Sequence, residues 1–148
     1  MAVVNFLLCC YTWGALMLGL LGPTDTGILR LKITNVRSDR GKIQVCLYHS
    51  KDGFPSDPSK SIKRANVIIR AGVSEVVFSD LPPGEYAVAL MHDENGNGKM
   101  DTNWVGIPKE GYGASNDAKA TFGPPKYNDA KFVLNANEAT LQIKVRYF

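Results

Sequence analysis

Hydrophobic and polar residues alternate along most of the chain with the period of two that marks a strand with one buried face. The clearest run is Ile28 to Thr34, where Leu29, Leu31 and Ile33 share one face. No segment keeps the period of an amphipathic helix. The alternation predicts about seven short strands, at Ile28 to Thr34, Lys42 to His49, Ala65 to Arg70, Val73 to Ser79, Glu85 to His92, Lys131 to Leu134 and Ala139 to Phe148.

Turn residues separate these runs. Asn35 to Gly41 predicts a connection that pairs the first two strands antiparallel. Leu81 to Gly84 is typical of a type II turn, with Gly84 supplying the positive φ. At 148 residues a single domain is expected. The pattern therefore predicts an all-β fold, an antiparallel β-sandwich of about seven strands over residues 23–148.

The N-terminal segment has a different composition. Residues 2–22 contain no charged side chain and are almost wholly apolar, which is typical of a signal peptide or an N-terminal membrane anchor. The first basic residue is Arg30, and Leu20 at position −3 suits cleavage after Gly22 poorly. A cleaved leader is still favoured, so the protein is expected to be secreted or periplasmic. It would be membrane-anchored only if the leader is retained.

The number of cysteines and the distribution of charged residues limit the functions that the sequence supports. Cys9 and Cys10 lie in the leader, which leaves Cys46 without a partner for an internal disulfide. Residues 28–70 carry ten Lys and Arg against three Asp and Glu. A basic half can favour anionic partners, but solvent-facing strand positions are the preferred explanation. No nucleic-acid partner is expected, because no aromatic residues interleave with the basic ones.

The stretch after the fifth predicted strand is crowded with Asp, Asn and Gly. Gly98 falls at position 6 of a calcium-binding loop, where a sharp bend is needed. Position 12 is Trp104 where a bidentate Glu is expected, so Glu110 or Asp117 would have to complete the shell. The expected calcium ligands at positions 1, 3, 5, 7 and 9 are Asp93, Asn95, Asn97, the Lys99 carbonyl and Asp101.

A plain turn is the competing interpretation of the same residues. Asn95-Gly96 and Asn97-Gly98 are pairs favoured in type I′ turns, so the segment can be the tip of a hairpin. Of the two interpretations the plain turn is slightly favoured. With neutral Asn at two positions, any calcium affinity should be low, about 10⁻⁴–10⁻³ M in dissociation constant.

Two further groups of residues are candidates for function. His49 and His92 each end a strand and would meet beside Asp93 if those strand ends were neighbours, as a metal or acid–base site. Histidines that only bond a backbone carbonyl are the commoner case. The loop from Trp104 to Phe122 is rich in apolar residues, so it either forms a ligand surface or closes one end of the sandwich. Closure is the favoured alternative; the surface would consist of Trp104, Ile107, Tyr112 and Phe122.

The segment from His92 to Pro125, HDENGNGKMDTNWVGIPKEGYGASNDAKATFGPP, resembles an uncharacterised family of secreted proteins, domain of unknown function 2141. The preceding LPPGEYAVAL and the GFP at Gly53 to Pro55 add to the resemblance, which covers essentially the whole chain after the leader. It implies export and a sandwich similar to prealbumin-like and carboxypeptidase-regulatory-like domains, with no established activity. A related purine-catabolic hydrolase is set aside, because that group ends in Tyr-Arg-Gly-Ser and this chain ends in Val-Arg-Tyr-Phe.

The leading hypothesis is an exported, non-catalytic β-sandwich. Calcium is the only cofactor expected, bound by the loop from Asp93 to Asp101, and the partner at the Trp104 to Phe122 loop is a protein or a glycan. The alternative is a small hydrolase or metal-dependent enzyme that uses His49, His92 and Asp93.

Overall fold

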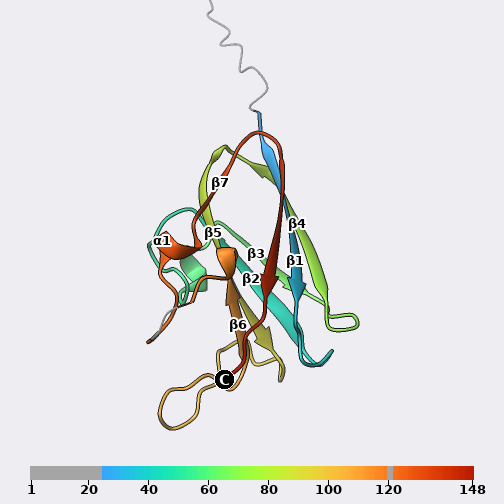
Figure 1. The fold of residues 1–148 in the computed structure, drawn as a ribbon, viewed down its shortest axis with the longest axis vertical. Helices are drawn as coiled ribbons and strands as arrows, with labels where there is room; N and C mark the ends of the chain where they lie inside the picture. The colour runs from blue at the N-terminus through green and yellow to red at the C-terminus, as the bar shows by residue number, and fades with distance from the viewer. Residues whose placement is uncertain (1–24, 120–121) are drawn as a thin grey trace, which may run out of the picture.

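The computed structural model describes residues 25–119 and 122–148, which form two β-sheets packed face to face (Figure 1). The predicted all-β sandwich is confirmed, with eight strands among the described residues in place of about seven. The predicted leader at residues 1–22 lies outside the described residues. In the part of the chain that is described, no helix is long and apolar enough to cross a membrane.

The smaller sheet has three strands in the order β4-β1-β8. They are β1 (Gly27–Thr34), β4 (Ser74–Leu81) and β8 (Glu138–Lys144). The central strand β1 pairs antiparallel with β4 and parallel with β8. The parallel pair is the one departure from a purely antiparallel arrangement among the described strands.

The larger sheet has five strands and carries the residues of interest. Its main path is β3 (Lys63–Val67), β2 (Lys42–Tyr48), β5 (Gly84–Asp93) and β6 (Gly111–Ala114). The short β7 (Phe132–Leu134) pairs with the first residues of β5, whereas β6 pairs with its last ones. The strand β5 therefore pairs with three others, β2, β6 and β7, and holds this sheet together.

The core lies between the sheets and follows the alternation in the sequence. Leu29, Leu31 and Ile33 of β1 are buried there, as predicted. Facing them are Val45 of β2 and Val88 of β5, which are fully buried. Because strand residues alternate between faces, the residues between these positions point out of the sandwich.

Two local predictions are wrong. The strands β1 and β2 do not pair with each other but lie in different sheets, β1 beside β4 and β8, and β2 beside β3 and β5. Strands that face each other across a core show the same alternation as strands that pair, so the pattern does not separate the two cases. Gly84 does not supply a positive φ; it begins β5, and Asp80 near the end of β4 has the left-handed conformation instead, with φ 57°.

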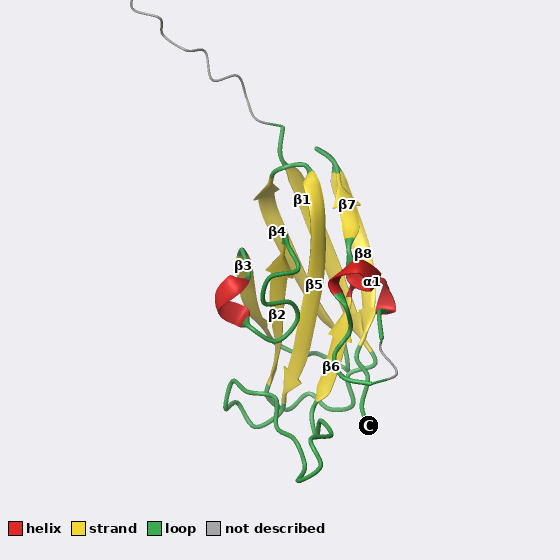
Figure 2. Ribbon diagram, turned by 90° about the vertical axis from the view of Figure 1, so that its left-hand side faces the viewer, coloured by secondary structure: helices red, strands yellow, loops and turns green. Residues whose placement is uncertain are grey.

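Small alanine side chains occupy part of the outer face of the larger sheet, and this part is covered. Ala87 of β5 packs there against residues from the segment after β6, with Phe54 and Tyr127 around them. The short helix α1 (Tyr127–Ala130) belongs to this cover (Figure 2). The Ser115 hydroxyl fastens it, donating to the carbonyl of Ala130 at 2.5 Å and accepting from the Val88 amide at 2.9 Å.

The loop after β5 and the C-terminus lie at the same end of the molecule, opposite the start of β1 (Figures 1 and 2). The segment after β8 joins the two sheets at this end. The Val145 amide donates to Thr34 of β1, and Arg146 exchanges two backbone hydrogen bonds with Tyr112 of β6. The strand β6, at which the long β5–β6 connection ends, is thereby joined to the segment after β8.

Candidate calcium loop and adjoining groove

The last residue of β5, Asp93, is fully buried and begins the candidate loop. Its Oδ2 atom accepts hydrogen bonds from the Gly98 amide at 3.0 Å and from Nε2 of Gln44 at 2.7 Å. The Lys42 ammonium lies 3.7 Å from the same oxygen. Strand register explains these contacts, because Lys42 of β2 pairs directly with Asp93.

The other carboxylate oxygen of Asp93 is in a different situation. Oδ1 is buried and has no hydrogen-bond partner among the described residues. Leaving a buried charged oxygen without a partner costs of order 1–3 kcal/mol or more. A cation beside Oδ1 would remove that penalty, so this atom is the strongest indication of a metal position in the loop.

Two asparagine side chains connect the loop to its far end. The amide groups of Asn95 and Asn97 both donate to the carboxylate of Asp101, at 2.6 Å for Asn95 and 3.0 and 3.1 Å for Asn97. Their carbonyl oxygens accept from the backbone two residues on, Asn95 from the Asn97 amide and Asn97 from the Lys99 amide. The structure therefore brings the predicted ligands together in a loop folded back on itself.

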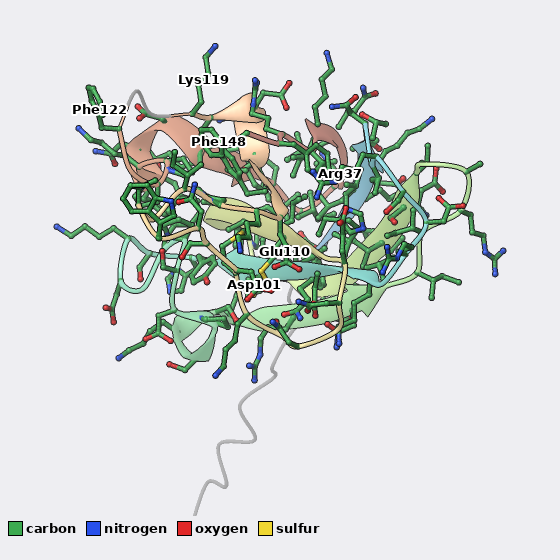
Figure 3. All side chains as sticks on the ribbon, turned by 90° about the horizontal axis from the view of Figure 1, so that it is seen from below. Arg37, Asp101, Glu110, Lys119, Phe122 and Phe148 are labelled. Atoms are coloured by element: carbon green, nitrogen blue, oxygen red, sulfur yellow. The ribbon has the colours of Figure 1, made fainter. Side chains whose placement is uncertain are left out.

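Glu110 closes the loop at its base. This side chain is buried, and its two oxygens accept from the backbone amides of Glu94, at 3.0 Å, and Asp101, at 3.1 Å. Figure 3 shows Asp101 and Glu110 next to each other at this end of the molecule. Of the two acidic residues considered for completing the shell, Glu110 reaches the loop. Asp117 instead accepts from the amide of Lys144, the last residue of β8.

The hairpin-tip interpretation does not describe this backbone. A type I′ turn needs a positive φ at both central residues. Gly96 and Gly98 each have φ 78°, but Asn95 and Asn97 are not in the left-handed region. The connection from β5 to β6 instead runs through residues 94–110 and is braced by a bridge between Thr102 and Pro108.

The donor set fits calcium only if amide and carbonyl oxygens take part. Within the described residues, no three His, Cys, Asp or Glu side chains gather as a metal site. The amide oxygen and nitrogen of an asparagine exchange places on a half-turn of the side chain. With a cation against Asp101, that half-turn would point the oxygens of Asn95 and Asn97 at the metal, in exchange for the hydrogen bonds that they accept from the Asn97 and Lys99 amides. Calcium prefers such oxygen ligands.

Arg37, Glu94 and Tyr147 form a charged network next to the loop. The Arg37 guanidinium binds the Glu94 carboxylate through two hydrogen bonds, at 2.7 and 3.0 Å, and lies 4.4 Å over the ring of Tyr147. It also donates to the carbonyl of Lys109. The hydrogen bond from Arg37 holds the pKa of Glu94 below its ordinary value of 4.5. This pair ties the first residue after β5 to the β1–β2 connection.

His92 contacts the same network through Tyr147. Its ring is fully buried, with Nε2 2.8 Å from the carbonyl of Arg40 and Nδ1 2.8 Å from the Tyr147 hydroxyl. A carbonyl can only accept, so Nε2 donates to Arg40, while Nδ1 also lies 3.4 Å from the Glu94 carboxylate. Both nitrogens of His92 are therefore engaged in holding the fold.

The structure does not bring the two histidines together. His92 of β5 pairs with Ile43, whereas His49 lies six residues farther along the chain, just after β2, and contacts the ring of Tyr86. At roughly 3.4 Å per residue this separation is about 20 Å. The alternative of a shared site for His49, His92 and Asp93 is therefore wrong in this respect. The neighbouring strands β2 and β5 are antiparallel, so their last residues lie at opposite ends of the sheet.

A groove of about 780 Å³ opens on the outer face of the larger sheet, beside the loop. Its floor follows the strand register, with Cys46 opposite Ala89, and Gln44 opposite Met91, which in turn faces Tyr112. Parts of three loops within residues 55–58, 98–108 and 122–125 form the walls. The candidate calcium loop therefore supplies one wall of the groove.

Three of the four residues predicted to form a partner surface lie at this groove. Ile107, Tyr112 and Phe122 line it, whereas Trp104 is not among its lining residues. The favoured alternative, in which the aromatic residues close the sandwich, is wrong for two of them. Trp104 is 94% exposed and Phe122 92% exposed, and Tyr112 stacks on Phe148 with ring centroids 5.4 Å apart.

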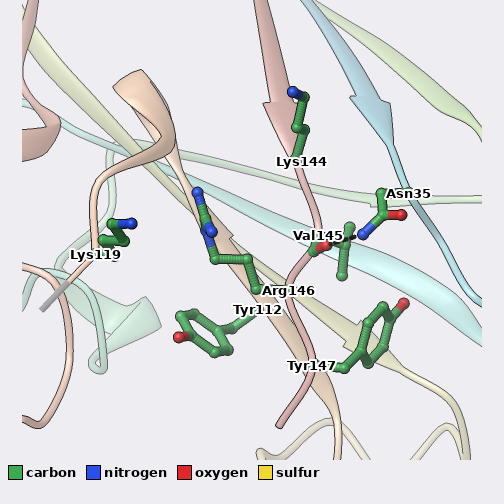
Figure 4. Close-up of a pocket in the computed structure, with 7 residues that line it drawn as sticks. All are labelled: Asn35, Tyr112, Lys119, Lys144, Val145, Arg146 and Tyr147. Carbon is green, nitrogen blue, oxygen red and sulfur yellow. Dashed lines mark hydrogen bonds between the residues drawn. The ribbon is translucent and has the colours of Figure 1, made fainter. Parts of the chain in front are cut away.

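A second, smaller pocket of about 410 Å³ shares Tyr112 with the groove (Figure 4). Three cationic side chains line it, those of Lys119, Lys144 and Arg146. Figure 4 shows Lys144 extending away from Lys119, so the three charges do not converge on one point.

Fold and site together define a two-layered β-sandwich domain with an Asx-rich loop at one end and an apolar groove beside it. The chain belongs to a family described as uncharacterized proteins conserved in bacteria (DUF2141), whose model matches residues 31–142. The predicted family is confirmed. No curated protein matches the chain.

Among solved structures, the chain is similar to the pilus-presented adhesin Spy0125 (Cpa). It is 14% identical to a cysteine mutant of that adhesin, with a TM-score of 0.27, over 86% of this chain and 28% of that one. For a second crystal form the values are 12%, 0.27, 81% and 26%. The chain thus spans less than a third of the adhesin, and at this TM-score the likeness supports no inference about function. The predicted likeness to prealbumin-like domains stays a prediction.

Proposed function

We propose that this protein is an exported, non-catalytic binding module whose loop from Asp93 to Asp101 binds calcium and thereby orders one wall of the groove. The observation that carries the proposal is the buried, unpartnered Oδ1 of Asp93. It lies in a loop where Asn95, Asn97 and Asp101 already contact one another. A divalent cation would give this oxygen the partner it lacks.

The loop and the groove share residues, which links metal binding to ligand binding. Gln44 donates to Asp93 and also lines the groove. Lys99 and Met100 belong to the loop sequence and line the groove wall. Calcium that holds the Lys99 carbonyl would fix the backbone that carries the Lys99 and Met100 side chains. A ligand then pays less ordering entropy on binding.

The test is the thermal stability of the full chain in EDTA and in calcium. Calcium at a hundredfold excess over its dissociation constant should stabilise the fold by about 2.7 kcal/mol, a rise in melting temperature of roughly 8 °C for a domain of this size. Asp93→Asn should abolish the rise, whereas the surface substitution Asp129→Asn should keep it. Equal melting in EDTA and calcium would remove the metal and leave the sandwich in place.

Export is supported by the charge-free segment at residues 2–22. We expect the mature protein to begin near residue 23 and to be found in the periplasm or the medium. N-terminal sequencing of the mature protein checks this. A mature protein that keeps residue 1 and sediments with membranes would instead be a tethered module, with its loops directed away from the start of β1.

A further inference from the structure

We propose that the groove binds a small amphipathic molecule with one acidic group, of the long-chain carboxylate class. Its apolar chain would lie over Cys46, Ala89 and Met91, and its acidic group beside Lys99. The inference rests on the proposed binding-module function and names the ligand class that this function leaves open.

The size of the groove favours a small molecule over a protein. Its volume of about 780 Å³ lies within the range of about 300–1,000 Å³ typical of small-molecule sites. Stable protein partners usually cover about 800 Å² on each side with a broad, flat contact. The groove is instead a recess between three loops on one half of a sheet face.

The lining favours an apolar ligand over a glycan. The floor carries Cys46, Ala89 and Met91, and the walls add Met100, Ile107 and prolines. A sugar would bury hydroxyl groups that need hydrogen-bond partners. The Gln44 amide, one of the few polar side chains present, already donates to Asp93. The flexible methionines suit a chain of variable shape.

Charge complementarity indicates an acidic group at the other end of the ligand. Among the described lining residues, Lys99 is the only charged side chain. It forms no ion pair within the described part of the chain. A single cation at the rim of an apolar groove is matched by a ligand with a single negative charge.

Cys46 provides a direct reporter for this experiment. It is the only cysteine of the described residues, it lies on the groove floor, and it is partly exposed. Burial raises the pKa of its thiol, so alkylation should be slow and is best followed at mildly alkaline pH. A bound chain would cover the sulfur and slow the reaction further.

The probe is dodecanoate, kept below its micelle-forming concentration and below the solubility of its calcium salt, and added to the full chain in calcium. Alkylation of Cys46 by iodoacetamide is followed by peptide mass spectrometry. Dodecanoate should protect Cys46 in a saturable way. Dodecanol should bind roughly fivefold more weakly, the scale of one partly solvated ion pair, and dodecyltrimethylammonium should bind more weakly still. Equal protection by all three, or none by any, overturns the proposal.

Two matched pairs of variants place the ligand. Lys99→Gln should weaken dodecanoate to the level of dodecanol, whereas Lys109→Gln, on the same connection but outside the groove, should leave it unchanged. Ile107→Ser should weaken both ligands, whereas Trp104→Ser should weaken neither. A loss with Arg146→Gln in place of Lys99→Gln would put the acidic group in the smaller pocket and overturn the assignment to Lys99.

The same titration separates this inference from the calcium proposal. If calcium raises the melting temperature but dodecanoate gives no protection, the ligand class is wrong and the metal site stands. If dodecanoate protects Cys46 equally in EDTA and calcium and the melting temperature does not respond to calcium, the metal site is wrong and the ligand class stands.

Discussion

The body of the sandwich and the loop end after β5 are stabilised by different interactions. In the body, fully buried side chains such as Leu47 and Val88 pack between two sheets. At the loop end, Asp93 and Glu110 accept hydrogen bonds from backbone amides, and the Asn95 side chain donates to Asp101. The body therefore depends on apolar area removed from water, and the loop on charge and hydrogen-bond geometry. Conditions that change charge should affect the two regions differently.

The largest effect is expected in the body. Leu47→Ala removes a fully buried side chain and should lower the free energy of unfolding by about 2–5 kcal/mol. The loss should be the same in EDTA and in calcium, because Leu47 lies on the core face of β2, away from the loop. Urea denaturation under both conditions measures it. A loss that depends on calcium would mean that the loop and the body do not act separately.

A smaller effect is expected at the base of the loop. Glu110→Gln replaces one accepting oxygen by a donor, which must then face a backbone amide of Glu94 or Asp101. The expected loss is about 1–3 kcal/mol, together with a weaker response to calcium. Glu138→Gln, at an exposed ion pair with Arg30, serves as the control and should cost less than about 1 kcal/mol. An equal loss in both variants would contradict a clamping role for Glu110.

The smallest effect concerns pH. Arg37 lowers the pKa of Glu94 below 4.5 in the folded protein, so the ionised form is favoured by folding. This contribution is present above pH 4.5 and is lost as the pH falls through the lowered pKa. Glu94→Gln should therefore flatten the acid side of the stability profile. Urea midpoints measured from neutral pH downward check this, and an unchanged profile in the variant would contradict it.

The strands of the body were predictable because one face of each is buried. The predicted Ile28 to Thr34 and Glu85 to His92 match β1 (Gly27–Thr34) and β5 (Gly84–Asp93) within one residue at each end. The choice of partners was not predictable, since β1 and β2 carry the same alternation whether they pair or face each other. Register then decides contacts such as that between Lys42 and Asp93, which nothing in the local sequence indicates.

The missed strand β6 shows a different limit. Its sequence, GYGA, has two glycines and no alternating apolar face. The structure explains the glycines: a Cβ atom on Gly111 would lie 2.5 Å from both Tyr147 and Val145, and one on Gly113 would lie 3.0 Å from Ile143. Because these positions carry no side chain, the C-terminal segment can pack directly against this strand. In the sequence alone, the same glycines indicate a loop.

The candidate site was predictable in its composition but not in its surroundings. The spacing of Asp93, Asn95, Asn97 and Asp101 indicated the loop, and Glu110 was one of two acidic residues considered for closing it. The groove could not be predicted, because its floor is the outer face of β2, β5 and β6, and β6 was taken for loop. Small outward residues such as Ala87 and Ala89 were the only signal that this face is covered or occupied.

The most direct test of the account is a crystal structure determined with calcium. We expect one ion within about 2.3–2.6 Å of oxygen atoms of the loop, including Oδ1 of Asp93 and a carboxylate oxygen of Asp101. The side-chain amides of Asn95 and Asn97 should have turned their oxygens toward it. A loop without an ion, in which both asparagines still donate to Asp101, would contradict the calcium site.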